Sequence, residues 1–121
     1  MDEKETANKK FQKELNAGIA SLVMLGVLAN SPEPLYGYQI AREIGAGKKN
    51  GLAMKQGALY PVLRGLEKSA LLESYVEPSV SAPPRRYYRI TLLGSEVFEQ
   101  WKTTWEQTRD LVDATLKGTV K

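Results

Sequence analysis

Apolar residues recur at helical spacing in the first quarter of the chain. Between about residues 9 and 29 they follow one helix face, at Phe11, Leu15, Ile19, Leu22, Val23 and Leu25. This periodicity predicts a helix over 9–29. The segment NSPEP at residues 30–34 ends that helix, because proline cannot continue one.

A shorter helix is predicted near residues 36–44, where Tyr36, Ile40 and Ile44 share one face. It ends at the sequence GAG, residues 45–47, because glycine readily takes the left-handed conformation that closes helices.

A third helix and a hairpin follow. A loop over residues 48–54 leads to a helix predicted over about 55–69, whose inner apolar stripe consists of Leu59, Val62, Leu63 and Leu66. Residues 71–76 and 85–90 are rich in apolar, aromatic and branched side chains and predict two strands. The polar, proline-containing segment 77–84 between them predicts a projecting loop.

The last helix is predicted to start after Thr91, whose hydroxyl can cap it, and to run to about Lys117. Its apolar seam alternates spacings of three and four at Phe98, Trp101, Trp105, Thr108, Val112 and Thr115. This spacing is typical of a coiled coil. One small domain cannot easily cover so long a helix, and we therefore expect the seam to form a subunit interface and not to pack within one chain.

The order of these elements predicts a mainly α fold with a small β-hairpin. It is that of a winged helix-turn-helix, α-α-α-β-β, over residues 9–90, followed by a C-terminal dimerisation helix over 91–117. Residues 1–8 and 118–121 are expected to be flexible. In helix-turn-helix proteins the recognition helix lies in the DNA major groove.

The charge is concentrated in the third helix and the hairpin. The chain has a net charge of +3, but residues 48–89 hold eight Lys or Arg against three acids, whereas residues 1–47 and 90–121 each have a net charge of −1. A basic stripe on one substructure is typical of proteins that bind the phosphate backbone. The alternative is an ordinary solvated face.

Several side chains of the third helix suit DNA. Lys55, Gln56 and Ala58 lie near its N-terminus and can reach guanine, adenine and a thymine methyl respectively. Tyr60 and Arg64 lie further along and are candidates for phosphate contacts, which fix register without reading sequence. Tyr60 borders the inner stripe, so the alternative for it is a core aromatic.

The hairpin adds two arginines. Arg85 and Arg86 follow a pair of prolines and are candidates for phosphate or minor-groove contacts. The alternative is an ion pair with Glu73 or Glu77 across the hairpin. Tyr38, in the second predicted helix, is a further candidate for DNA contact.

The composition argues against an enzyme. The chain has no cysteine and no histidine, which removes the usual metal ligands and the usual general base. Two carboxylate pairs, Glu96 with Glu99 and Asp110 with Asp113, are best interpreted as solvated faces of the last helix. We expect no catalytic residue, metal or cofactor.

The chain is expected to be cytoplasmic. Its N-terminus carries charges of both signs and lacks the layout of a signal peptide. The most apolar run, residues 17–29, is shorter than the roughly 20 residues of a membrane span and predicts a buried core helix. The absence of cysteine suits a reducing compartment.

Three blocks of the sequence resemble the PadR family of winged-helix transcriptional regulators. They read LYGYQI at 35–40, GALYPVL at 57–63 with Leu66-Glu67, and PRRYYRIT at 84–91 with Gly94. The blocks lie in order and at suitable spacing over about residues 18–94. The length and single C-terminal helix resemble the small subgroup of that family.

This resemblance implies a homodimer in which the last helix packs against the first helix of the partner. It also implies a pseudo-palindromic operator in double-stranded DNA and a repressor that a small molecule releases. Some small members bind flat aromatic compounds beside tryptophans of the last helix, which places Trp105 and then Trp101 nearest such an effector. The alternative is that these tryptophans only pack the subunit interface. Phe98 and Leu15 are expected at the same interface.

The sequence departs from the family pattern at four places. The pattern tends to have Thr at Ala58, Arg at Gly65, Gly at Ala70 and a capping Ser near Lys55. Gly65 in mid-helix costs about 1 kcal/mol relative to alanine, which indicates close approach to another helix or to a nucleic-acid backbone. Ala58 and Gly65 motivate a second hypothesis, a ligand-binding or protein-interaction module on this fold with little sequence-specific DNA binding.

Overall fold

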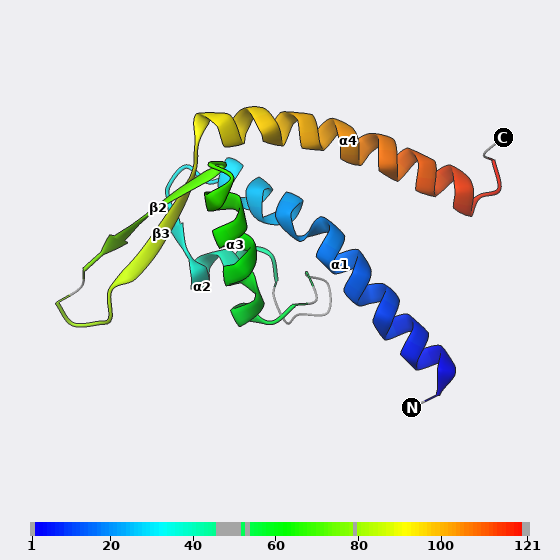
Figure 1. Cartoon of the computed structure of the whole chain (residues 1–121), viewed down its shortest axis with the longest axis horizontal. Helices are drawn as coiled ribbons and strands as arrows, with labels where there is room; N and C mark the ends of the chain where they lie inside the picture. The colour runs from blue at the N-terminus through cyan, green and yellow to red at the C-terminus, as the bar shows by residue number, and fades with distance from the viewer. Residues whose placement is uncertain (1, 46–51, 53, 79, 120–121) are drawn as a thin grey trace.

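The structure is a computed structural model that describes residues 2–45, 52, 54–78 and 80–119. In chain order its elements are α1 (Glu3–Ala29), β1 (Leu35–Tyr36), α2 (Gly37–Glu43), the 3-10 turn η1 (Gln56–Ala58), α3 (Leu59–Lys68), β2 (Leu72–Glu77), β3 (Arg85–Ile90) and α4 (Leu92–Leu116). The predicted winged helix-turn-helix with a long last helix is confirmed. Figure 1 shows α2, α3 and the β2–β3 hairpin at one end of the molecule, with both chain termini at the other.

The sheet has three antiparallel strands in the order β1-β3-β2. The prediction that Tyr36 belongs to the second helix was wrong: Tyr36 lies in β1, opposite Tyr87, and its extended backbone precedes α2. The Tyr36 N–H donates to Oε1 of Gln39 at 3.0 Å, which helps to begin α2 one residue later. A two-residue strand carries no periodicity, and its partner is about fifty residues away in sequence, so no local pattern could reveal it.

The first helix is longer than predicted. It begins at Glu3 and not near Lys9, because Asp2 caps it: Asp2 Oδ1 accepts the Glu5 N–H at 2.8 Å. Acidic side chains in the first turn also favour the positive end of the helix dipole. The segment expected to be flexible is therefore largely helical. Near the C-terminus of the chain, the last helix α4 ends at Leu116 with Lys117 as its C-cap, as predicted.

The core lies where α1, α2, α3 and the sheet meet. Its fully buried side chains are Met24, Leu25, Ile40, Leu59, Leu63 and Leu72. The predicted inner stripe of α3 is confirmed, since Leu59, Leu63 and Leu66 are buried and Val62 is partly buried. Within the described ranges, no helix combines the length and the apolarity that a membrane span requires.

The structure describes only the first residue of the predicted helix-closing segment 45–47. Gly45 follows α2 with φ of 66°, as its sequence position predicts. The remainder of the predicted cap and most of the 48–54 loop lie outside the described residues, although Leu52 is buried and its N–H donates to the Ile44 carbonyl at 2.9 Å.

A compact junction links α3, the sheet and α4. The Leu71 N–H donates to the Leu66 carbonyl and the Ala70 N–H to the Glu67 carbonyl, both at 2.9 Å, which is the Schellman motif. The motif holds Ala70 in the left-handed region, at φ of 64°. This explains why the family pattern has glycine there.

Replacing Ala70 by glycine should therefore stabilise the protein. A left-handed alanine costs about 1 kcal/mol that glycine avoids, so Ala70→Gly should raise the free energy of unfolding by about 1 kcal/mol. Urea denaturation at fixed protein concentration measures it. Ser69→Gly is the control, because Ser69 has φ of −84° and gains nothing from glycine. Equal or lower stability of Ala70→Gly than of wild type would contradict the assignment.

Candidate nucleic-acid interface

The segment predicted to meet base edges forms the entry to α3. Lys55 is extended, Gln56–Ala58 form η1, and the side chains of Lys55, Gln56 and Ala58 are exposed. Neither η1 nor α3 begins with a side-chain cap. This agrees with the missing serine near Lys55.

The predicted phosphate contacts lie further along α3. Arg64 is exposed, and Tyr60 is 39% exposed and thus not a core aromatic. The Tyr60 hydroxyl oxygen lies 2.7 Å from the position that a Cβ at Gly37 would take. Because only glycine fits beneath it, Tyr60 packs on the start of α2 and is still partly exposed.

The structure gives Gly65 no internal role. Gly65 is exposed, and a Cβ there would meet no described atom within 4 Å. The close approach predicted from the sequence is therefore not made by another described helix of this chain. Approach to a nucleic-acid backbone stays a prediction.

The arginines of the hairpin are exposed and lie on opposite faces, as neighbours on a strand do. Arg85 lies over the ring of Tyr36, with its guanidinium carbon 4.5 Å from the ring centroid. Arg86 donates to the Ser74 hydroxyl at 3.0 Å. In the described part of the chain neither arginine forms an ion pair with Glu73 or Glu77; Arg89 pairs with Glu73 instead, at 2.6 Å.

The outward face of the sheet is aromatic. Tyr75 stacks on Tyr87 at 5.6 Å, and Tyr36 meets Tyr87 edge to face at 5.5 Å. Such cross-strand pairs stabilise a hairpin. On the inward face, burial raises the pKa of the Tyr88 hydroxyl, while the charge of Arg86 acts to lower it and that of Glu67 to raise it. Tyr88 therefore remains neutral at physiological pH.

The basic side chains gather at one end of the molecule. Figure 1 shows α3 beside the β2–β3 hairpin, and these two elements with their flanks carry Lys55, Arg64, Lys68, Arg85 and Arg86. Lys48 and Lys49, which contribute to the basic segment of the sequence, lie outside the described residues. Tyr38 is 53% exposed on α2.

A second feature is an apolar groove between α1 and α4, with a volume of about 840 Å³. The two helices are close at the core and diverge toward the chain termini (Figure 1). Its apolar lining includes Phe11, Leu15, Ile19, Leu22, Trp101, Trp105, Val112 and Leu116. Phe11 and Trp105 are 62% and 40% exposed. Phe11 was predicted on the apolar face of the first helix but not as a site residue. Its position near the start of that helix, far from the residues predicted to form the core, is the signal that could have identified it.

The predicted seam divides into two parts. Phe98 does not line the groove, because its ring packs against α1, with Cε1 3.3 Å from the position of a Cβ at Gly26. Trp101 is partly buried against the core and also lines the groove. Trp105 and Val112 remain exposed. The expectation that the whole seam is free for a partner was thus wrong for Phe98, since glycine at 26 lets the helices approach closely.

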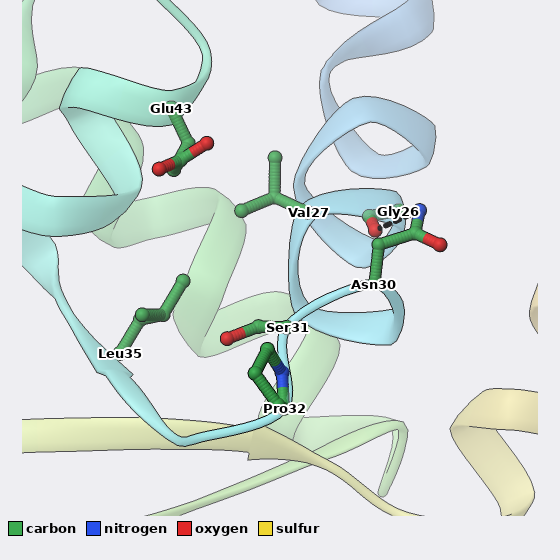
Figure 2. Close-up of a pocket in the computed structure, with 7 residues that line it drawn as sticks. All are labelled: Gly26, Val27, Asn30, Ser31, Pro32, Leu35 and Glu43. Carbon is green, nitrogen blue, oxygen red and sulfur yellow. Dashed lines mark hydrogen bonds between the residues drawn. The ribbon is translucent and has the colours of Figure 1, made fainter.

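A smaller hollow of about 480 Å³ lies between the end of α1 and α2. Figure 2 shows Val27, Leu35 and Glu43 around it, with Ser31 and Pro32 from the connecting turn. None of the residues predicted to bind DNA or an effector lines it. No group of three or more potential metal ligands occurs among the residues that the structure describes.

Comparison with known proteins identifies the family. Residues 24–100 match the Transcriptional regulator PadR-like family. An uncharacterized protein of Lysinibacillus sphaericus is 32% identical over 83 residues, which cover 69% of this chain and 76% of that protein.

Solved structures agree. The crystal structure of a PadR family transcriptional regulator from Eggerthella lenta DSM 2243 is 33% identical, with a TM-score of 0.74 over 93% of this chain and 94% of that chain. A PadR-like transcriptional regulator from Bacillus cereus is 27% identical, with a TM-score of 0.69 over 85% and 96%. The chain belongs to the PadR-like family of transcriptional regulators, which are DNA-binding proteins and not enzymes.

Proposed function

We propose that two copies of this chain form a repressor that binds a pseudo-palindromic operator and is released by a small aromatic effector. The observation that carries this proposal is the exposed basic surface of α3 and the β2–β3 hairpin on a winged helix-turn-helix fold. Phosphate neutralisation by such a surface supplies much of the affinity for DNA.

In this proposal the entry to α3 reads bases. Lys55, Gln56 and Ala58 are exposed at its N-terminal end, where recognition helices contact base edges. Tyr60 and Arg64 contact phosphates and fix the register. Their exposure, and the absence of a described ion pair on Arg64, support these roles.

The hairpin and α2 flank the recognition helix. Arg85 and Arg86 contact phosphates or the minor groove, which attracts arginine where it is narrow. Stacking of Arg85 on Tyr36 restricts that side chain without neutralising it. The Tyr38 hydroxyl donates to a phosphate from the exposed side of α2.

The groove between α1 and α4 supports the homodimer. An exposed apolar surface of this extent is costly in water and marks an interaction site. Helices packed at a twofold axis would bury Leu15 and Trp105, which are 43% and 40% exposed in the single chain. In an isologous interface, α4 of each protomer then meets α1 of the other.

The same groove suits the effector. Ligand sites are mostly apolar hollows of about 300–1,000 Å³ with few polar groups. Here Trp101 and Trp105 line the groove and would stack on a flat aromatic molecule, and the lining also includes the charged residues Arg109 and Asp113. Repression requires only that the dimer cover its operator. An effector that changes the angle between the protomers would change the spacing of the two recognition helices, so that they no longer match the half-sites.

A cytoplasmic location of the protein stays a prediction.

The second candidate is a ligand-binding or protein-interaction module with little sequence-specific DNA binding. The small residues Ala58, exposed in η1, and Gly65, exposed on α3, favour this second candidate because neither offers a polar side chain to DNA. Footprinting on the region upstream of the chain's own gene separates the two: a protected pseudo-palindrome supports the repressor, and uniform weak protection supports the module.

DNA affinity should fall steeply with salt, and Arg64→Ala should reduce that dependence. Each phosphate contact adds about 1 to the slope of log affinity against log salt, so a dimer that loses one contact per half-site should lose about 2. Fluorescence anisotropy with a duplex from the upstream region, over a salt series, measures it. Lys4→Ala is the control, because it removes the same charge near the free end of α1. Salt-independent binding, or equal effects of the two variants, would contradict the proposal.

The dimer should depend on Trp105. Truncating a central interface tryptophan costs about 2 kcal/mol or more, which is roughly a thirtyfold weaker dimer. Analytical ultracentrifugation of Trp105→Ala over a concentration series tests this expectation. Gln107→Ala is the matched control, since Gln107 is exposed on α4 but does not line the groove. A wild-type monomer at all concentrations, or equal weakening by both variants, would overturn the interface.

A further inference from the structure

A chain of hydrogen bonds joins the recognition helix to the hairpin. The Ser74 hydroxyl donates to Oε2 of Glu67 at 2.7 Å, and the same hydroxyl accepts from Nη1 of Arg86 at 3.0 Å. The three residues come from α3, β2 and β3 respectively. In the part of the chain that the structure describes, Ser74–Glu67 is the only side-chain hydrogen bond between α3 and the sheet.

The position of Glu67 on α3 is informative. Tyr60, Arg64 and Glu67 are spaced four and three residues apart and form one stripe along the helix surface. Two of them are the proposed phosphate contacts. The third, Glu67, is negatively charged, and a negative charge on this surface would repel the phosphates of DNA.

The hairpin needs support beyond the core. Leu72 and Tyr88 are buried, but β2 beyond Ser74 and the start of β3 are exposed. A two-stranded ribbon of this kind bends and twists readily. Arg86, a long and flexible side chain at the start of β3, loses that freedom when its guanidinium is held by Ser74.

We propose that Glu67 and Ser74 are positioning residues that hold Arg86 and the hairpin at a fixed place relative to α3, so that both elements meet DNA in one register. The inference rests on the proposed DNA binding by α3 and the hairpin. Glu67 acts through Ser74 and does not itself contact phosphate, which would repel it.

The direction in which DNA affinity changes when Glu67 is replaced distinguishes a positioning role from a purely electrostatic one. Removing an acid from a DNA-binding surface strengthens binding when only charge matters. Loss of a positioning acceptor weakens it, because the hairpin and Arg86 must then be ordered on the DNA.

The experiment compares Glu67→Ala with Glu67→Gln. Both variants remove the charge, but the glutamine Oε1 still accepts the Ser74 hydroxyl. We expect Glu67→Ala to weaken DNA binding roughly tenfold, about the worth of one hydrogen bond to a charged group, and Glu67→Gln to bind as wild type or more tightly. Both side chains suit a helix, and thermal unfolding checks the fold. Tighter binding by both variants, or equal weakening by both, overturns the inference.

A double-mutant cycle and a measurement without DNA complete the test. Ser74→Ala should weaken binding in the wild-type background and weaken it less in an Arg86→Ala background, where only the contact between Ser74 and Glu67 is left to lose; fully additive losses contradict the relay. In the free protein, Ser74→Ala should speed hydrogen exchange of hairpin amides around Tyr75 and Tyr87 and leave α1 and α4 unchanged. Unchanged hairpin exchange overturns the inference even if wild type fails to bind DNA, an outcome that would separately remove the proposed function.

Discussion

The hydroxyl of Thr91 connects three elements that would otherwise be free to move apart. It donates to the Ala70 carbonyl at 2.7 Å and accepts the Gly94 N–H at 2.9 Å, while the Thr91 N–H donates to the Leu71 carbonyl at 3.0 Å. The end of α3, the start of β2 and the start of α4 therefore share one junction. Gly94 completes it, because any Cβ there would overlap the Leu71 carbonyl and lie 2.7 Å from Cγ1 of Ile90.

This junction sets the geometry of both proposed binding surfaces. On one side it orients the hairpin relative to α3, so that Arg64 and Arg86 lie on adjoining elements. On the other it directs α4 along α1, where Phe98 closes the near end over Gly26 and the far end opens into the apolar groove. The junction thus connects the start of α4 to the end of the recognition helix through a few hydrogen bonds, and the proposed effector and second protomer would act on DNA binding through it.

Local patterns predicted the elements whose residues share one periodic face. The stripe ending at Leu66, both hairpin strands and the Thr91 cap could be predicted because each depends on neighbours in sequence. The strand at Leu35–Tyr36 could not, since it forms only by pairing with β3. The same holds for Phe98, whose burial depends on glycine in a distant helix, and for the Ser74–Glu67–Arg86 relay, which joins three elements. The candidate DNA contacts were predicted by residue type, and the structure adds which of them are exposed and how they are held.

The proposed DNA-binding surface consists of α3 and the hairpin, and not of the groove between α1 and α4. Backbone amide chemical shifts, followed by NMR during titration with a duplex from the upstream region, test it directly. We expect the largest changes on η1, on the exposed side of α3 around Arg64 and at the start of β3 at Arg85 and Arg86. Changes centred on Phe11, Trp105 and the rest of the groove, with α3 unaffected, would contradict it.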